Sequence, residues 1–181
     1  PTFRDADGLW EGHRVEEVAT PEAYDHAPMT VHRFYDARRS ALLAVQPNAA
    51  HHALARLEEV LGDDLLVITQ NIDDLHERAG SRRVLHMHGE LLSALCRACD
   101  GRVRWESDLV DLPPCPGCGV TELRPDVVWF GEIPYGMDRI SIELARADLF
   151  VSIGTSGAVY PAAGFVQHAL RYGATTLELN L

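Results

Sequence analysis

Five short apolar runs are spread along this 181-residue chain, and each predicts a strand that is buried on both faces. These runs are residues 65–69, 84–87, 126–130, 149–153 and 175–179. Amphipathic stretches lie before and between them. Strands that alternate with helices predict a parallel sheet covered on both faces, so the expected fold class is α/β.

Five stretches carry the spacing of apolar residues that predicts helices. They are residues 31–43, 48–61, 73–79, 137–147 and 162–172. Gly62 and Gly80 directly follow two of these stretches, at a position where glycine commonly ends a helix. Residues 1–30 are rich in Gly, Pro, Asp and His and lack clean periodicity, so we expect an extended loop with short helical pieces there.

We expect residues 1–181 to form one domain in which two insertions interrupt the sheet. The first, at about residues 7–60, is helical, and the second, at about residues 90–124, contains all four cysteines. Pro1 has no strand before it, and Leu181 directly follows an apolar run. We therefore expect the chain to be an internal piece of a longer protein.

Composition narrows the class of partner. The chain is 46% hydrophobic, enough for one good core. Its formal net charge of −11 argues against a nucleic-acid binder, which would gain affinity by neutralising phosphates, and suits basic partners such as lysine-rich peptide segments. No apolar run approaches the roughly 20 residues that span a bilayer, and the sequence shows no signal peptide.

The four cysteines predict a metal site. Their spacing is C-x2-C-x15-C-x2-C, which can close a tetrahedral four-thiolate site, and zinc is favoured over iron. Four thiolates leave no open coordination position, so the metal is expected to be structural. A zinc ribbon that binds nucleic acid is the less favoured alternative, because residues 101–106 carry little basic charge. The ligands are Cys96, Cys99, Cys115 and Cys118, and paired thiols of this kind indicate a reducing cytoplasm.

Polar side chains follow the first predicted strand, where open α/β sheets place their ligands. Gln70, Asn71 and Asp73 lie here, and amide and carboxylate groups can bind a carboxamide or ribose hydroxyls. The alternative is ordinary turn and capping chemistry before the short helix that follows. Taken alone, the segment favours neither interpretation.

Histidines end the second predicted strand. His86 and His88 alternate there, His88 lies 15 residues beyond Asp73, and Gly89 allows a close approach of ligand or backbone. An isolated histidine is more often structural, but a position beside a polar crevice favours a catalytic role. Residues 154–157 (Gly-Thr-Ser-Gly) follow another strand and suit phosphate or ribose contacts, although tight turns use the same residues.

Assembled in order, these segments resemble the sirtuins, the NAD-dependent protein lysine deacylase family. The resemblance covers nearly the whole chain. The matching segments are Pro1–Arg4, Gly8–Trp10, Thr69–His76, Ala79–Gly80, His88–Gly89, the two C-x-x-C pairs, Arg124–Pro125, Trp129–Glu132, Gly154–Ser156 and Leu179–Asn180. The resemblance implies a Rossmann-like NAD-binding fold with a smaller lobe made of a zinc ribbon and a helical insertion.

The resemblance also implies a role for each matching residue. His88 corresponds to the catalytic base. The cofactor contacts are implied to be Phe3 and Arg4 of a covering loop, Gln70, Asn71, Ile72 and Asp73 around nicotinamide and its ribose, and Gly154, Thr155, Ser156, Asn180 and Leu181 around the rest of NAD. The strand implied to pair with the substrate backbone comprises Val128, Phe130, Gly131 and Glu132.

The family's reaction consumes NAD rather than using it as a hydride carrier. The acyl-lysine carbonyl oxygen attacks the nicotinamide ribose carbon as nicotinamide leaves. Unprotonated His88 is then implied to deprotonate a ribose hydroxyl, which attacks the resulting imidate. The products are free lysine and an O-acyl-ADP-ribose.

Tyr35 and Arg38 form a Tyr-x-x-Arg pair that resembles the feature of sirtuins that remove succinyl and malonyl groups. Three apart on a helix, the two residues share a face, so both can reach one acyl pocket. Arginine pairs bidentately with a carboxylate and tyrosine adds a hydroxyl donor. An isolated pair would more often be a core tyrosine and a solvated charge, and the family context favours the acyl pocket.

The glycine-rich segment that cradles the pyrophosphate in the family would lie upstream of Pro1. We expect a cytoplasmic deacylase that acts on acetyl and acidic acyl groups of lysine peptides and proteins, with NAD as co-substrate and one structural Zn²⁺. No nucleic acid or membrane partner is expected, and a monomer is the expected state. The alternatives are protein mono-ADP-ribosyl transfer and a catalytically inert zinc-ribbon binding module.

Overall fold

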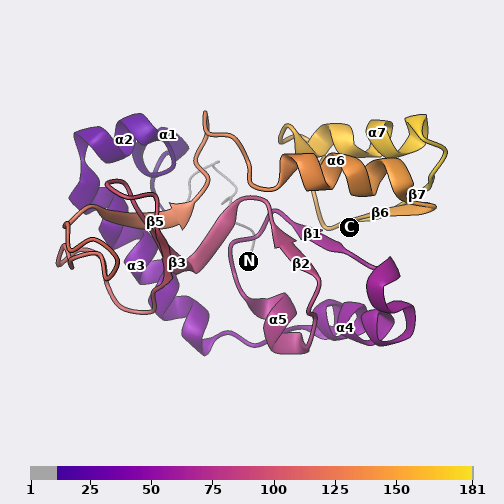
Figure 1. Cartoon of the computed structure of the whole chain (residues 1–181), viewed down its shortest axis with the longest axis horizontal. Coiled ribbons are helices and arrows are strands. Elements are labelled where there is room, and N and C mark those ends of the chain that lie inside the picture. The colour runs from indigo at the N-terminus through magenta and orange to yellow at the C-terminus, as the bar shows by residue number, and fades with distance from the viewer. Residues whose placement is uncertain (1–11, 181) are drawn as a thin grey trace. The chain divides into compact units, whose positions relative to one another are not determined.

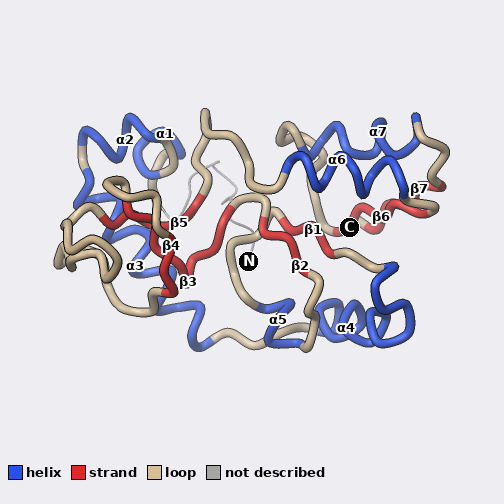
Figure 2. Tube along the Cα trace, in the orientation of Figure 1, coloured by secondary structure: helices blue, strands red, loops and turns tan. Residues whose placement is uncertain are grey.

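The computed structural model describes residues 12–180, and the chain divides into two compact units. The first unit runs from Pro1 to Tyr135 and the second from Gly136 to Leu181. Figure 1 follows the elements of each unit in chain order, and Figure 2 separates helices from strands. Among the described residues, no helix is both long and apolar enough to cross a bilayer.

Helices make up much of the first unit. They are α1 (Val15–Val18), α2 (Pro21–His26), α3 (Pro28–Ala44), α4 (Ala49–Leu61), the 3₁₀ turn η1 (Gly62–Asp64) and α5 (Leu75–Ala79). Thr20 caps α2 by accepting the Ala23 N–H at 3.1 Å, and Asn48 caps α4 in the same way. The predicted helices at 31–43 and 48–61 are confirmed, as are short helical pieces before residue 30.

Two small sheets complete the first unit. Strands β1 (Val67–Thr69) and β2 (Val84–His86) pair in parallel. Strands β3 (Gly89–Cys96), β4 (Arg102–Arg104) and β5 (Leu123–Val127) form an antiparallel sheet with the order β4-β3-β5. Figure 2 shows these strands as two separate groups.

The prediction that residues 126–130 form another parallel strand is wrong. Strand β5 ends at Val127 and pairs antiparallel with β3. Only residues 126 and 127 of the predicted run belong to β5. The run is apolar because Val127 and Trp129 belong to the buried cluster that also contains residues of α3. The edge position of β5 also tolerates Pro125, which has no N–H to donate.

Helix α3 packs its apolar face against the antiparallel sheet. Val31, Phe34 and Tyr35 belong to one buried cluster with Leu91 of β3 and Trp129. These contacts remove a continuous apolar surface from water, which is the main stabilising contribution to such a unit.

A buried ion pair fixes α3 further. Asp36 and Arg39 pair on the helix, and the Asp36 carboxylate accepts the Leu109 N–H at 2.9 Å. Arg39 donates to the carbonyls of Leu91 and Ser107. Because these partners belong to the cysteine-bearing region, the pair sets the position of α3 against that region.

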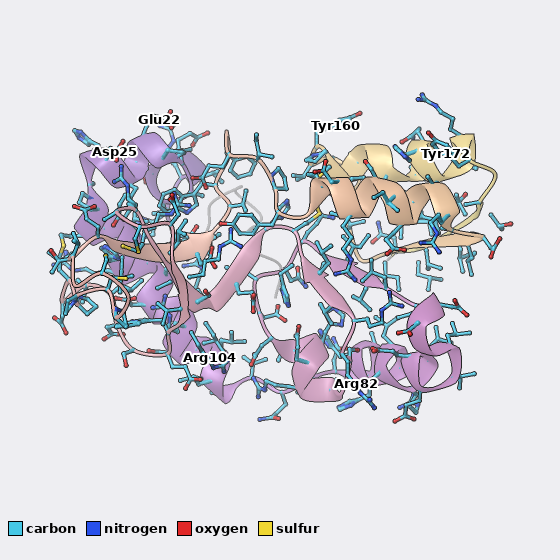
Figure 3. The ribbon with its side chains drawn as sticks, viewed as in Figure 1. Glu22, Asp25, Arg82, Arg104, Tyr160 and Tyr172 are labelled. Atoms are coloured by element: carbon cyan, nitrogen blue, oxygen red, sulfur yellow. The ribbon has the colours of Figure 1, made fainter. Side chains whose placement is uncertain are left out.

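The second unit consists of a parallel pair of strands with helices along one face (Figure 1). Its elements are α6 (Met137–Arg146), β6 (Leu149–Ile153), the 3₁₀ turn η2 (Ala162–Gly164), α7 (Phe165–Arg171) and β7 (Thr175–Leu179). The strands pair in register from Leu149 with Thr175 to Ile153 with Leu179. Tyr160 and Tyr172 extend into solvent from this unit (Figure 3). Parallel strands connected through helices confirm the α/β class.

Candidate active site and metal centre

The segment after β1 is fixed by its own main-chain carbonyls. Consecutive carbonyl oxygens of Gln70, Asn71 and Ile72 accept hydrogen bonds from His88 Nδ1 at 3.1 Å, His86 Nδ1 at 3.3 Å and the Leu91 N–H at 2.7 Å. These bonds turn the carbonyls of residues 70–72 toward β2 and β3. A segment held in this way is pre-organised, which lowers the entropy lost on binding a ligand.

The side chains of Thr69 and Asp73 make turn hydrogen bonds with main-chain N–H groups. Asp73 Oδ1 accepts the Leu75 N–H at 3.1 Å at the start of α5, and Thr69 Oγ1 accepts the Asn71 N–H at 3.0 Å. Asp73 therefore makes a turn hydrogen bond just before Asp74, the N-cap residue of α5. This bond uses one carboxylate oxygen, which can also accept from other donors.

His88 has the protonation state that a base needs. Its Nδ1 faces the Gln70 carbonyl oxygen at 3.1 Å, so Nδ1 carries the proton and Nε2 keeps a lone pair. Burial lowers the pKa of His88, and the hydrogen bond to Gln70 opposes that shift only in part. The ring is therefore neutral at pH 7.

Gly89 is required immediately after His88. Its φ is +82°, and a Cβ atom there would lie 2.1 Å from the carbonyl oxygen of Asp126 in β5. The His88 carbonyl accepts the Val128 N–H at 2.9 Å. The close approach of the chain around Gly89 to β5 thus fixes the main chain on which His88 is carried.

Residues 128–132 contain the predicted substrate-pairing segment. The Phe130 N–H donates to the Ala19 carbonyl at 3.0 Å, and the Phe130 side chain is exposed. Glu132 instead binds inward: its carboxylate accepts from Arg124 at 2.7 and 2.8 Å and from the Trp129 N–H. The structure places Val128, Phe130, Gly131 and Glu132 just beyond the end of β5, outside its described strands.

Tyr35 and Arg38 differ in their surroundings. The Tyr35 hydroxyl accepts a hydrogen bond from Trp129 Nε1 at 3.0 Å, and burial raises the pKa of Tyr35. The Arg38 guanidinium lies 3.3 Å from the centroid of the Phe34 ring and donates to the Phe34 carbonyl. The helical spacing is as expected, but Tyr35 points toward Trp129.

A cavity of about 270 Å³ lies beside Arg38, lined by His13, Thr30, Arg33, Phe34, Ala37 and Arg38. Arg33, which was not predicted as a site residue, gives the cavity a second guanidinium. Arg33 and Ala37 are four residues apart on α3, next to the face that carries Thr30, Phe34 and Arg38. This spacing could have indicated that Arg33 lines the cavity.

The second unit carries its own loop of candidate residues. Asn180 Nδ2 donates to the Thr155 carbonyl at 3.0 Å, and the Gly154 N–H donates to the Leu179 carbonyl at 2.9 Å. Ser156 Oγ accepts the Ala158 N–H at 3.4 Å. The structure therefore brings Gly154, Thr155, Ser156 and Asn180 together at the ends of β6 and β7. The predicted residues Phe3, Arg4 and Leu181 lie outside the described residues.

The four cysteine sulfurs form one cluster. They all lie within 4.8 Å of one another, with Sγ–Sγ distances of 3.7 Å between Cys96 and Cys118 and 3.9 Å between Cys99 and Cys115. Tetrahedral zinc with bonds of about 2.3 Å requires sulfur–sulfur separations of about 3.8 Å. The residues fit a structural zinc ion.

Comparison with known proteins agrees with these features. A family model described as "SIR2: Sir2 family" matches residues 1–161. The NAD-dependent protein deacylase of Salmonella typhimurium is 57% identical over 99% of this chain and 67% of its own length, and that of Yersinia pseudotuberculosis is 59% identical over 99% and 66%. A solved Sir2 homologue–NAD complex superposes with a TM-score of 0.87 at 44% identity, covering 98% of this chain and 70% of that one.

Proposed function

The chain belongs to the Sir2 family, and on that premise we propose that it is an NAD-dependent deacylase that removes acyl groups from protein lysines. The observation that carries the proposal is the arrangement of His88. Its Nδ1–H is held by the Gln70 carbonyl, its Nε2 is a neutral base, and the ring lies beside the pre-organised segment 70–73. The relatives at 57–59% identity have the same activity in their names.

Each residue group has a proposed task. Gln70, Asn71, Ile72 and Asp73 contact nicotinamide and its ribose, and His88 takes the proton from a ribose hydroxyl through Nε2. Gly154, Thr155, Ser156 and Asn180 offer contacts for another part of NAD, as do Phe3, Arg4 and Leu181. When NAD is bound, it supplies the ribose carbon that accepts the acyl oxygen. Residues 128–132 contact the main chain of the substrate.

The cysteine cluster has a structural task in this proposal. Cys96, Cys99, Cys115 and Cys118 would hold one zinc ion with no open coordination position, so the metal takes no part in proton or acyl transfer. The proposed domain is the whole of 1–181, with insertions at about 7–60 and 90–124. The paired thiols suit a reducing cytoplasm, and the acidic surface suits lysine-rich protein substrates rather than nucleic acid or membranes, with a monomer as the working form.

Besides acetyl-lysine, the proposed substrates are lysines that carry acidic acyl groups such as succinyl and malonyl. Arg38 lines a cavity that also contains Arg33, and two guanidiniums favour a carboxylate. Tyr35 lies outside the lining of this cavity, and its proposed contribution is the hydroxyl proton, which remains available to donate while the oxygen accepts from Trp129.

Paired peptides test the proposal. The protein and its variants His88→Ala, Arg38→Met and Arg56→Met are incubated with NAD and either acetyl-lysine or succinyl-lysine peptide. We expect the wild-type protein to deacylate both peptides and His88→Ala to deacylate neither. Arg38→Met should lose only the succinyl activity, while Arg56→Met, an exposed arginine of α4, serves as the matched control.

Two results would favour the alternatives. ADP-ribose attached to protein, without release of lysine, would indicate mono-ADP-ribosyl transfer. If the wild-type protein consumes no NAD with either peptide but keeps its zinc, the binding-module alternative replaces the deacylase.

A further inference from the structure

His86 is a nearly buried histidine to which the proposed chemistry gives no role. Its side chain is 8% exposed and lies two residues before the proposed base. Nε2 lies 2.8 Å from Glu77 Oε1 of α5, and Nδ1 lies 3.3 Å from the carbonyl oxygen of Asn71. Both ring nitrogens therefore face oxygen atoms that can only accept hydrogen bonds.

This geometry determines the charge of the ring. A neutral imidazole has one N–H and could satisfy only one of the two acceptors, whereas an imidazolium donates to both. The ionisable groups that face the ring are Glu77 and His76 of α5 and Glu90 of β3, and the two carboxylates outweigh the one histidine. Burial alone would lower the pKa of His86, but the hydrogen bond and charge of Glu77 raise it overall.

The acceptor at Nδ1 connects His86 to the cofactor segment. Asn71 lies between Gln70 and Ile72, whose carbonyls are bound by His88 and by the Leu91 N–H. The bond from His86 completes a row of three, so its loss would free the middle peptide group of the segment. The same residue, Asn71, also provides the side chain that is a proposed contact to nicotinamide.

We propose that His86 is a positioning residue: as an imidazolium held by Glu77, it fixes the Asn71 peptide group in the conformation that binds NAD, and NAD affinity falls when it loses its proton. The inference rests on the proposed function, because it assigns the 70–73 segment to NAD. It makes cofactor affinity depend on pH through a group that does not touch the reacting atoms.

The direction of the pH dependence follows from linkage. The pKa of His86 is raised in the folded protein, so the stabilising bonds are complete below pH 6.5 and are lost as the pH rises through the folded value. Binding of NAD must, reciprocally, raise that pKa further, because NAD binds the protonated form more tightly.

Calorimetric titration with NAD, in the absence of peptide, tests the proposal. For the wild-type protein we expect the Kd for NAD to rise about tenfold between pH 6 and pH 9, the lower end of the effect of a hydrogen bond to a charged group. His86→Gln should bind weakly at both pH values, with a flat profile. His52→Gln makes the same change at an exposed position of α4 and should keep the wild-type profile.

A second measurement applies even where His86→Gln fails to fold. NMR titration of the wild-type imidazole rings should give His86 a pKa above 6.5 that rises when NAD is saturating. Equal values with and without NAD, or parallel Kd profiles for wild type and His86→Gln, would overturn the inference while leaving the deacylase intact. A protein that binds no NAD at any pH would remove the proposed function and this inference together.

Discussion

In the sequence, His86 and His88 precede Gly89 and the four cysteines follow it, and the two groups are held in place by different interactions. The cysteines form a site from side chains alone, with all four sulfurs within 4.8 Å. The two histidines are held by main-chain carbonyls of the segment that follows β1. The first arrangement fits a structural ion, which would add stability, and the second fixes charge and tautomer. We therefore expect stability and reactivity to be separable in this chain, and three substitutions and one pH profile test that expectation.

Removing a metal ligand should have the largest effect. Cys99→Ser leaves three thiolates, and structural zinc contributes roughly 10–16 kcal/mol to the folding of small zinc domains. We expect loss of bound zinc and of cooperative unfolding in urea, measured with metal content by mass spectrometry. His88→Ala is the comparison and should keep one zinc per chain. A Cys99→Ser protein with full zinc content would contradict the four-thiolate assignment.

Removing the proposed base should affect rate and little else. His88→Ala loses a general base, which typically contributes about 10²–10⁴-fold to rate. We therefore expect kcat to fall by that factor while the urea midpoint and the zinc content stay at wild-type values. A parallel loss of stability would mean that His88 is mainly structural, and the separation of the two regions would not hold.

The buried ion pair of α3 should show an effect on stability of intermediate size. Arg39→Met leaves the Asp36 carboxylate buried without its cation, which typically costs about 3–5 kcal/mol. Urea unfolding measures the change. Arg33→Met removes an exposed arginine from the same helix and should change stability by less than about 0.5 kcal/mol. Equal effects of the two variants would show that the pair adds nothing to its helix.

The pH dependence should give the smallest effect near neutrality. Burial lowers the pKa of His88, so the ring is a free base at pH 7 and is protonated only at acid pH. With saturating NAD, kcat/KM for the acylated peptide should be flat above pH 6.5. It should fall about tenfold per pH unit below the pKa of His88. A midpoint of the acid limb above 6.5 would indicate a charged partner that the structure does not show.

The features that could be predicted from the sequence are those set by local patterns along the chain. The cysteine site follows from residues three apart, and the helices of the first unit from periodicity and from caps such as Asn48. The two strands of the second unit have the predicted bounds, Leu149–Ile153 and Thr175–Leu179. These features need only neighbours along the chain or the 2.0- and 3.6-residue repeats.

Long-range contacts explain what could not be predicted. Tyr35 meets Trp129, which is 94 residues away, and no spacing on α3 indicates that partner. The role of His86 depends on Glu77 and on a carbonyl oxygen, and carbonyls are invisible in a pattern of side chains. The run 126–130 resembles a strand because Val127 and Trp129 are buried against residues distant in the sequence, and no pattern along the chain shows that residues 123–127 pair antiparallel with β3.

Gly89 has a consequence for protein engineering. Because no side chain fits between its main chain and the Asp126 carbonyl, β3 and β5 are locked together at the end nearest His88. At the other end of this strand pair, the Arg97 N–H donates to the Glu122 carbonyl at 2.9 Å, so the segment between these residues begins and ends at one place. A designer could lengthen or shorten parts of that segment without redesigning the proposed base, provided that Gly89, the four cysteines and the contacts of Ser107 and Leu109 with α3 are kept.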